Sequence, residues 1–301
     1  MVDGNNPGGD AMVEPSEHGH GYSGGRADGR SGTAGLTVPL ESRSSLAPAV
    51  THAAALLELL AAEPRTPARL SDLSRRLRLP KSSVANICAA LVATGLLRRT
   101  DAGFALGWKL AQLGAAYLST VDRVQEFYDA CFRLEIASGE TIQLGMLDDR
   151  EVVYLGRHDG RQPVRLVSEI GQRLPASCTA MGKAALASLD PDDLAERYRG
   201  LRSLPVLTRN SHRTFRSLLA DLGGIRERGY SVDDEETAEG VLCLGVAITG
   251  PQTTDKPYAA SLTLLRVRAT DDRRAALIAD LRRLAMMLAG PLSESAGASR
   301  R

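Results

Sequence analysis

Hydrophobic residues between positions 46 and 107 recur at the three- and four-residue spacing of short amphipathic helices. The spacing predicts one helix over residues 48–62, a second that stops at Leu79-Pro80, and a third that starts at once and ends at Gly95. The expected buried positions are Val50, Ala54, Leu57, Ala61, Leu70, Leu73, Leu77, Val84, Ile87, Cys88 and Leu91. The expected helix caps are Thr66, which precedes Pro67, and Ser82 or Ser83.

The pattern changes to turn formers and alternation after Gly95. Residues 96–99 and 104–106 flank the turn formers of residues 100–103, and this order predicts a β-hairpin. Two helices joined by a tight turn and followed by a hairpin are typical of a winged helix-turn-helix. We therefore assign residues 46–107 to an all-α-type winged helix-turn-helix DNA-binding domain.

The polar side of the third predicted helix carries small residues, which would let the helix enter a major groove. Asn86 has the geometry for a bidentate contact to adenine, and the start of the helix directs backbone N–H groups toward phosphate. Arginines at the base of the hairpin are expected to neutralise further phosphates. The predicted DNA-contacting residues are Lys81, Ser82, Ser83, Asn86, Arg98 and Arg99. A solvated helix face explains any one of them equally well, but the pattern as a whole favours DNA.

Charge is distributed unevenly along the chain. The whole sequence has 37 basic and 36 acidic residues, so no bulk attraction to nucleic acid or to a membrane follows. Residues 50–110 hold nine basic and four acidic residues, a net charge of +5. Arg75, Arg76 and Arg78, around the predicted turn, are expected to add phosphate contacts. This local excess favours DNA binding over simple solubility.

The chain ends differ in composition from the rest. Residues 1–45 are rich in Gly, Ser, Asp and Pro, so we expect a disordered N-terminal tail there and a flexible C-terminal tail over residues 292–301. No apolar run reaches the roughly 18 residues that span a bilayer, and we expect no membrane partner. The four cysteines are scattered without a CxxC pair, which favours reduced thiols and a cytoplasmic location.

Helical spacing returns after the hairpin. Residues 108–122 predict a linker helix with Leu110, Leu113 and Tyr117 on one stripe, which suits either an ordinary core or a dimer seam. We favour the seam, because a protein that contacts symmetric DNA generally needs two copies of the helix that enters the groove. A further helix is expected over residues 121–137. Its expected buried residues are Val124, Tyr128, Cys131 and either Leu134 or Glu135.

Strand and helix patterns are mixed in residues 123–291. This order predicts an α+β domain in which helices cover an antiparallel sheet. The expected strands are residues 141–147, 151–155, 164–168, 241–248 and 258–267, and the expected helices are residues 179–189, 192–199, 214–228 and 273–289.

Two motifs in this region resemble the signatures of one family. Residues 171–187, GQRLPASCTAMGKAALA, and residues 229–246, GYSVDDEETAEGVLCLGV, are similar to the effector-binding domain of IclR-family transcriptional regulators. The segments LPKSSV and FALGWKLAQLG resemble the winged domain of that family. The resemblance implies a GAF-like domain over residues 123–291, homodimers that often pair into homotetramers, and repression or activation of neighbouring genes. We therefore expect a ligand-responsive regulator, more often a repressor, whose partners are operator DNA and a small-molecule effector.

The resemblance also implies an effector pocket between the first motif and the strands of the second. By position in the two motifs, the resemblance implies the pocket residues Cys178, Ala180, Met181, Asp233 and Cys243. Our predicted register of the last strand adds Leu262 and Leu264 to this pocket. In this register Ser261 and Thr263 face away, which favours an organic acid with an aromatic, alkyl or lactone-like portion. A slip of one residue would reverse the assignment, because strand faces alternate.

The pocket residues have structural alternatives. Cys243 suits an ordinary apolar core equally well, and Cys178 suits the packing of a helix start. Asp233 is a common turn former that hydrogen-bonds its own backbone. We expect Glu235 and Glu236 to be structural or solvated.

Enzymatic chemistry has little support in the sequence. The run CTAMGK lacks the first glycine and the Ser/Thr of a phosphate-binding loop, and no cysteine–histidine pair has a nucleophile signature. His158, Asp233 and Glu236 lack the spacing of metal ligands. We expect no catalytic residues, no cofactor and no metal. The alternative function is a small-molecule sensor whose winged domain binds protein instead of DNA.

Overall fold

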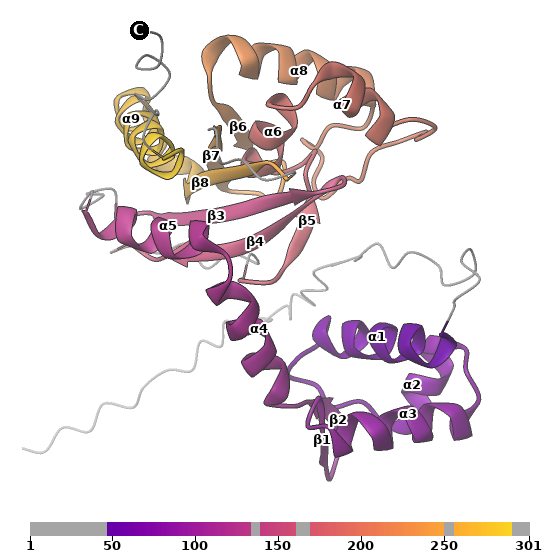
Figure 1. The fold of residues 1–301 in the computed structure, drawn as a ribbon. Helices are drawn as coiled ribbons and strands as arrows, with labels where there is room; N and C mark the ends of the chain where they lie inside the picture. The colour runs from indigo at the N-terminus through magenta and orange to yellow at the C-terminus, as the bar shows by residue number, and fades with distance from the viewer. Residues whose placement is uncertain (1–46, 134–138, 161–168, 250–255, 291–301) are drawn as a thin grey trace, which may run out of the picture. The chain divides into compact units, whose positions relative to one another are not determined.

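The computed structural model describes residues 47–133, 139–160, 169–249 and 256–290. The chain divides into two compact units between Gly107 and Trp108, and each unit is described by itself (Figure 1). The predicted N-terminal and C-terminal tails and the predicted strand at residues 164–168 lie outside the described residues.

The first unit has the predicted order of helices and hairpin. Its elements are α1 (Pro48–Ala61), α2 (Leu70–Leu77), α3 (Lys81–Ala93), β1 (Leu97–Thr100) and β2 (Gly103–Leu106). The two strands pair antiparallel, with Leu97 opposite Leu106. The predicted helix-turn-helix is therefore confirmed.

The faces and ends of these helices differ in part from the predictions. Helix α1 buries Leu56 and Leu60, whereas Val50 is exposed, so the predicted phase of this helix is wrong. The predicted side-chain caps are also wrong, because Arg69 and Pro80 occupy the cap positions of α2 and α3 and make no capping bond. The three helices and β1 share one apolar core, whose buried residues are Leu56, Leu60, Leu73, Val84, Cys88, Leu91 and Leu97.

The second unit is an α+β domain, as predicted. Its helices are α4 (Lys109–Ser119), α5 (Asp122–Arg133), α6 (Ala180–Ala187), α7 (Pro191–Arg197), α8 (Phe215–Arg228) and α9 (Asp271–Leu288), with a 3-10 turn η2 (Arg266–Arg268). Its strands are β3 (Thr141–Asp148), β4 (Glu151–His158), β5 (Arg173–Pro175), β6 (Ser231–Asp234), β7 (Val241–Ile248) and β8 (Tyr258–Leu265). The short strands β5 and β6 were absent from the prediction.

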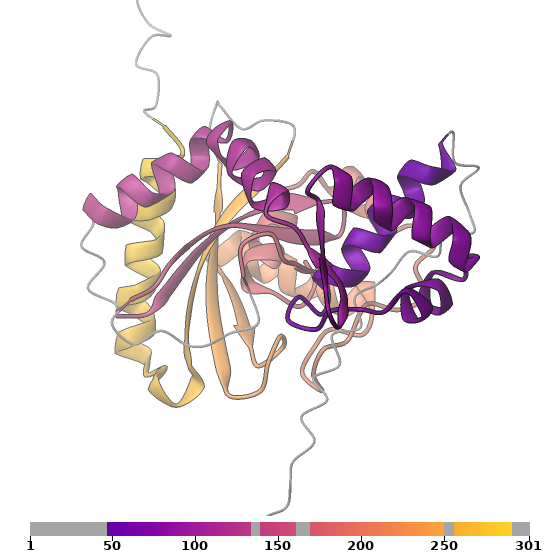
Figure 2. The ribbon, with the colours of Figure 1, turned by 90° about the horizontal axis from the view of Figure 1, so that it is seen from below.

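The six strands form one antiparallel sheet in the order β5-β4-β3-β8-β7-β6. Helices α5 and α9 lie side by side on one face of the sheet, and α6 and α8 lie on the other (Figures 1 and 2). This arrangement gives two separate apolar cores, one on each face.

Strand β8 is buried on both faces, and its two sets of side chains belong to different layers. Leu262 and Leu264 are fully buried in the core formed with the leucines of α9, such as Leu277 and Leu281. Ala259, two residues before Ser261, packs in the core on the α6 side. The predicted register is therefore wrong, because Leu262 and Leu264 face α9 and Ser261 and Thr263 face α6.

Helices α4 and α5 expose several large apolar side chains. Helix α5 buries Val124, Phe127 and Cys131 but leaves the predicted core residue Tyr128 exposed. Helix α4 buries none of its residues in the single chain.

Among the described residues, no helix combines the length and apolar character needed to cross a membrane.

Candidate functional site

The first candidate surface is the solvent side of α3. Val84, Cys88 and Leu91 are buried, which fixes the rotation of the helix. Lys81, Ser82, Ser83 and Asn86 are exposed on the opposite side. Because no side chain caps this helix, the backbone N–H groups of its first turn are open to an anion.

The hairpin adds two further cations to this unit. Arg98 and Arg99 are exposed on β1, and the guanidinium of Arg99 lies 5.9 Å from the centre of the Phe104 ring. Two arginines of α2 differ from these because they already have carboxylate partners. Arg75 pairs with Asp72 at 2.8 Å, and Arg76 pairs with Glu63 at 3.0 Å. The arginines of the hairpin are thus better placed for phosphate than those of α2.

The second candidate region is the sheet face under α6, where polar residues stand in two rows. The register pairs Thr141 with Thr263, Thr263 with Cys243, and Cys243 with Asp233. The neighbouring row pairs Arg157 with Gln143, Gln143 with Ser261, and Ser261 with Gly245. Directly paired residues share a face, so these side chains point to the α6 side. We call them the polar rows; they comprise Thr141, Gln143, Arg157, Asp233, Cys243, Ser261 and Thr263.

The start of α6 lies directly on the polar rows. The Ser231 hydroxyl donates to the carbonyl of Ala180 over 2.5 Å. A Cβ atom added to Gly245 would come within 2.6 Å of the same carbonyl, and one added to Gly145 within 2.2 Å of Met181 Sδ. At Gly245 the clash would be with backbone, so only glycine allows this close approach, whereas at Gly145 it would be with the flexible end of the Met181 side chain. The structure therefore brings Ala180 and Met181 to the same side as Cys243 and Asp233.

Asp233 is engaged by its own turn. Its Oδ1 accepts the backbone N–H groups of Glu236 at 2.7 Å and Thr237 at 3.1 Å, and its Oδ2 accepts the Thr237 hydroxyl at 2.7 Å. Burial raises the pKa of this carboxyl, while those hydrogen bonds lower it. This geometry matches the turn-forming alternative for Asp233, although the turn also holds its carboxylate in the polar rows.

Two other polar groups of this region are held in their neutral forms. Burial, together with the charge of Asp233, raises the pKa of Tyr154 and that of Cys243. The thiol of Cys243 lies 3.4 Å from the hydroxyl of Thr263. Neutral hydroxyl and thiol groups can donate hydrogen bonds to an acid, so the face suits a polar ligand more than an apolar one.

Cys178 precedes α6 and is fully buried. Its thiol donates to the carbonyl of Pro205 at 3.4 Å, and its carbonyl accepts the Thr237 hydroxyl at 2.9 Å. The cap of α6 is Thr179, whose hydroxyl accepts the N–H of Gly182. Cys178 therefore links the start of α6 to the turn that holds Asp233.

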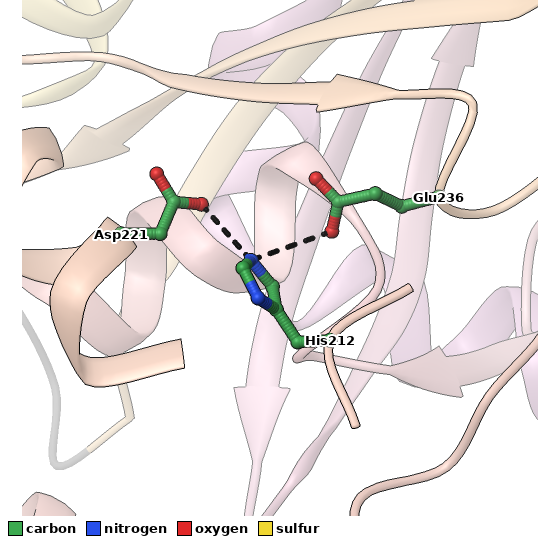
Figure 3. A group of neighbouring side chains, drawn as sticks. All are labelled: His212, Asp221 and Glu236. Atoms are coloured by element: carbon green, nitrogen blue, oxygen red, sulfur yellow. Dashed lines mark hydrogen bonds and ion pairs between the residues drawn. The ribbon is translucent and has the colours of Figure 1, made fainter. Parts of the chain in front are cut away.

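A buried charge cluster lies beside this region, and sequence reasoning did not find it. Lys183 on α6 is 0 % exposed and donates to Asp221 at 2.8 Å and to Glu236 at 2.5 Å. His212 Nε2 lies 3.4 Å from Asp221 and 3.8 Å from Glu236 (Figure 3). The signal was the lysine in the otherwise small and apolar run AMGKAALA.

His212, Asp221 and Glu236 have ligand atoms close enough together to hold a metal ion. The ammonium of Lys183, however, already binds both carboxylates. Burial alone would raise the pKa of Asp221. The hydrogen bond from His212 and the charge of Lys183 nevertheless hold this pKa well below its usual range. The cluster therefore has its own cation.

Comparison with known proteins covers both units. Residues 115–289 match the model of the bacterial transcriptional regulator IclR C-terminal domain, and residues 49–101 match that of the IclR helix-turn-helix domain. The chain is 33% identical over 184 residues to the HTH-type transcriptional regulator KdgR of Escherichia coli K12, covering 60% of this chain and 68% of KdgR. It is 30% identical over 241 residues to the probable transcriptional regulator SauR of Cupriavidus necator, covering 78% of this chain and 92% of SauR.

A solved structure shares the fold. The crystal structure of an IclR homologue from Microbacterium hydrocarbonoxydans, complexed with 4-hydroxybenzoate, has a TM-score of 0.68 and 22% identity, covering 80% of this chain and 97% of that one. The similarity extends over the described helix-turn-helix unit and the α+β unit.

Proposed function

Because the chain belongs to the IclR family of bacterial transcriptional regulators, we propose that it acts in the cytoplasm as a homodimer, or a pair of dimers, that represses neighbouring genes in response to a small organic acid. The observation that carries the DNA part is the surface of α3. This helix exposes Lys81, Ser82, Ser83 and Asn86 while three apolar residues anchor its other side.

Asn86 should carry base specificity. Replacing it with alanine removes a bidentate partner for adenine, so we expect a loss of about 1–3 kcal/mol on the operator and little change on a shuffled duplex. Fluorescence anisotropy with the DNA that flanks the gene, in 50–100 mM salt, measures both affinities. An equal loss on the two duplexes would instead assign Asn86 a phosphate contact.

We propose that the effector lies over the polar rows, beside the start of α6. The N–H groups at the start of α6 favour a carboxylate, and the hydroxyls of Ser261 and Thr263 and the thiol of Cys243 can bind further oxygen atoms. These groups favour a small polar or hydroxylated acid. Our sequence-based expectation of an aromatic or lactone-like effector depended on the leucines of β8 facing the pocket. These leucines instead face the core formed with α9.

Thermal-shift screening of small hydroxy acids, with 4-hydroxybenzoate among them, tests this pocket. A ligand at 100 times its dissociation constant adds about 2.7 kcal/mol to the stability of the native state. We expect Thr263→Val to abolish most of that stabilisation, because a buried ligand oxygen is left without its partner. The same variant without ligand should unfold within a few degrees of the wild type. Unchanged ligand stabilisation in Thr263→Val would place the acid elsewhere.

We propose that α4 forms the dimer seam. Leu113 and Tyr117 are 50% and 52% exposed and lie four residues apart on one stripe of this helix. Replacing both with aspartate should shift the protein to monomers in sedimentation velocity, since the charges would face each other across the seam. The exposed neighbour Gln112 provides the matched control, and Gln112→Asp should leave the dimer intact. Dimers of the double variant would exclude this seam.

Residues 108–120 open the second unit and join it covalently to the helix-turn-helix unit, and we propose that they couple effector binding to DNA binding. Coupling requires that the effector bind differently to the DNA-competent and the DNA-incompetent states. An acid that stabilises the protein but leaves its affinity for operator DNA unchanged would refute the coupling.

A further inference from the structure

The buried charge cluster leaves one acceptor without a donor. Glu236 uses Oε1 for Lys183, whereas its Oε2 is buried and has no hydrogen-bond partner within the described residues. His212 Nε2 lies 3.8 Å from it, beyond hydrogen-bond distance (Figure 3). Asp221, by contrast, has its Oδ1 paired with Arg228 at 3.1 Å in addition to its bond with Lys183. A buried carboxylate oxygen without a donor is costly, so it needs an explanation.

The same residue is tied to the wall of the proposed pocket through its backbone. Its N–H donates to Asp233 at 2.7 Å, and its carbonyl accepts the Ser211 hydroxyl at 2.7 Å. The next residue, Thr237, donates to the carbonyl of Cys178 at 2.9 Å, directly ahead of α6. The backbone of Glu236 and its neighbour Thr237 therefore connect the buried charge cluster to the turn that carries Asp233 and to the residue ahead of α6.

Protonation of Glu236 would remove its ion pair. The ionised carboxylate pairs with Lys183 and leaves Oε2 unsatisfied. The protonated carboxyl carries no charge to pair with Lys183, and His212 Nε2 cannot accept its proton while it donates to the ionised Asp221. Burial raises the pKa of Glu236 to about 7, and the charge of Lys183 offsets only part of this rise. The loss of the ion pair therefore falls near neutral pH.

We propose that Glu236 is a proton-linked positioning residue of the effector pocket, and that uptake of one proton breaks its ion pair with Lys183 and loosens the turn that holds Asp233 near α6. The inference rests on the proposed function, since the pocket is itself a proposal. The ionisable groups around this carboxyl are Lys183 from α6, Asp221 from α8, Asp233 from β6, Cys243 from β7, His212 from the segment before α8, and Cys178 ahead of α6.

Urea denaturation of the full chain between pH 5 and 8 tests the proton. A carboxyl whose pKa is raised from 4.5 to about 7 on folding contributes stability below pH 4.5 and loses it as the pH rises through 7. Within that window the folding constant should fall by up to about tenfold per pH unit because of this group. Glu236→Gln, which mimics the protonated form, should lose this slope. Glu239→Gln, an exposed glutamate of the same loop, should keep it. A Glu236→Gln profile identical to that of the wild type would overturn the proposal.

Thiol labelling tests the positioning. Iodoacetamide modification of Cys178 and Cys243 at pH 8, followed by peptide mass spectrometry, should be several-fold faster in Glu236→Gln than in the wild type or Glu239→Gln. Equal rates in all three proteins would contradict a link between Glu236 and the pocket wall. Neither readout needs an effector. If no acid binds but both effects occur, the pocket proposal fails and the proton site stands. If an acid binds and neither effect occurs, the pocket proposal stands and the proton site fails.

Discussion

Replacing Lys183 with methionine should lower the free energy of unfolding of the α+β unit by about 3–5 kcal/mol, the cost of leaving buried charges without their partner. The methionine keeps the length and the apolar stem of the side chain. It leaves Asp221 with His212 and Arg228, and it leaves Glu236 with no cation within bonding distance. Urea denaturation followed by circular dichroism measures the loss at pH 8, where Glu236 of the wild type is mostly ionised.

An exposed lysine provides the matched control for this variant. Lys256 pairs with Asp148 at 2.6 Å on the surface, where solvent screens the pair. Lys256→Met should therefore change the free energy of unfolding by no more than about 1 kcal/mol. If Lys183→Met were as mild as Lys256→Met, the buried cluster would contribute little, and the link from α6 to the β6–β7 turn would lose its physical basis.

The second large effect concerns DNA. Replacing Lys81, Arg98 and Arg99 together with alanine should weaken binding to any duplex by about a hundredfold or more in 100 mM salt, and should reduce the slope of log K against log salt by roughly 2–3 units. The three side chains are exposed and have no carboxylate partner in the described part of the chain. Fluorescence anisotropy across a salt series measures both quantities.

Arg75 and Arg76 offer a control with the same kind of charge in the same unit. Both already pair with carboxylates on or before α2. The double alanine variant should therefore leave the salt slope close to that of the wild type. Should this control instead lose as much affinity as the triple variant, general charge and not the geometry of α3 and the hairpin would account for DNA binding.

Sequence patterns were sufficient for the elements whose periodicity is strong. The spacing of Leu73, Val84 and Leu91 predicted α2 and α3, and the structure buries all three residues. The same pattern predicted the exposed side of α3. Once three positions of a helix face the core, its rotation about its own axis is fixed, and so are the positions that face solvent. In the α+β unit, the longer helices and the hairpin of β3 and β4 were predicted for the same reason.

Register and long-range pairing could not be predicted in this way. Strand β8 is buried on both faces, so hydrophobicity carries no information about which side chains face α6, and our register was off by one residue. Lys183 meets Glu236 across 53 positions of sequence, a contact that no local pattern encodes. Strands β5 and β6 are three and four residues long, too short for alternation to be visible.

The most direct test of the account is the affinity of the full chain for the duplex that flanks its own gene, compared with a shuffled duplex of equal length in 100 mM salt. We predict binding to the flanking duplex at least about 10³-fold tighter than to the shuffled one, with a steep loss of affinity as salt rises. Equal affinity for both duplexes, or binding that does not change with salt, would contradict the assignment of α3 and the hairpin as the DNA-contacting surface.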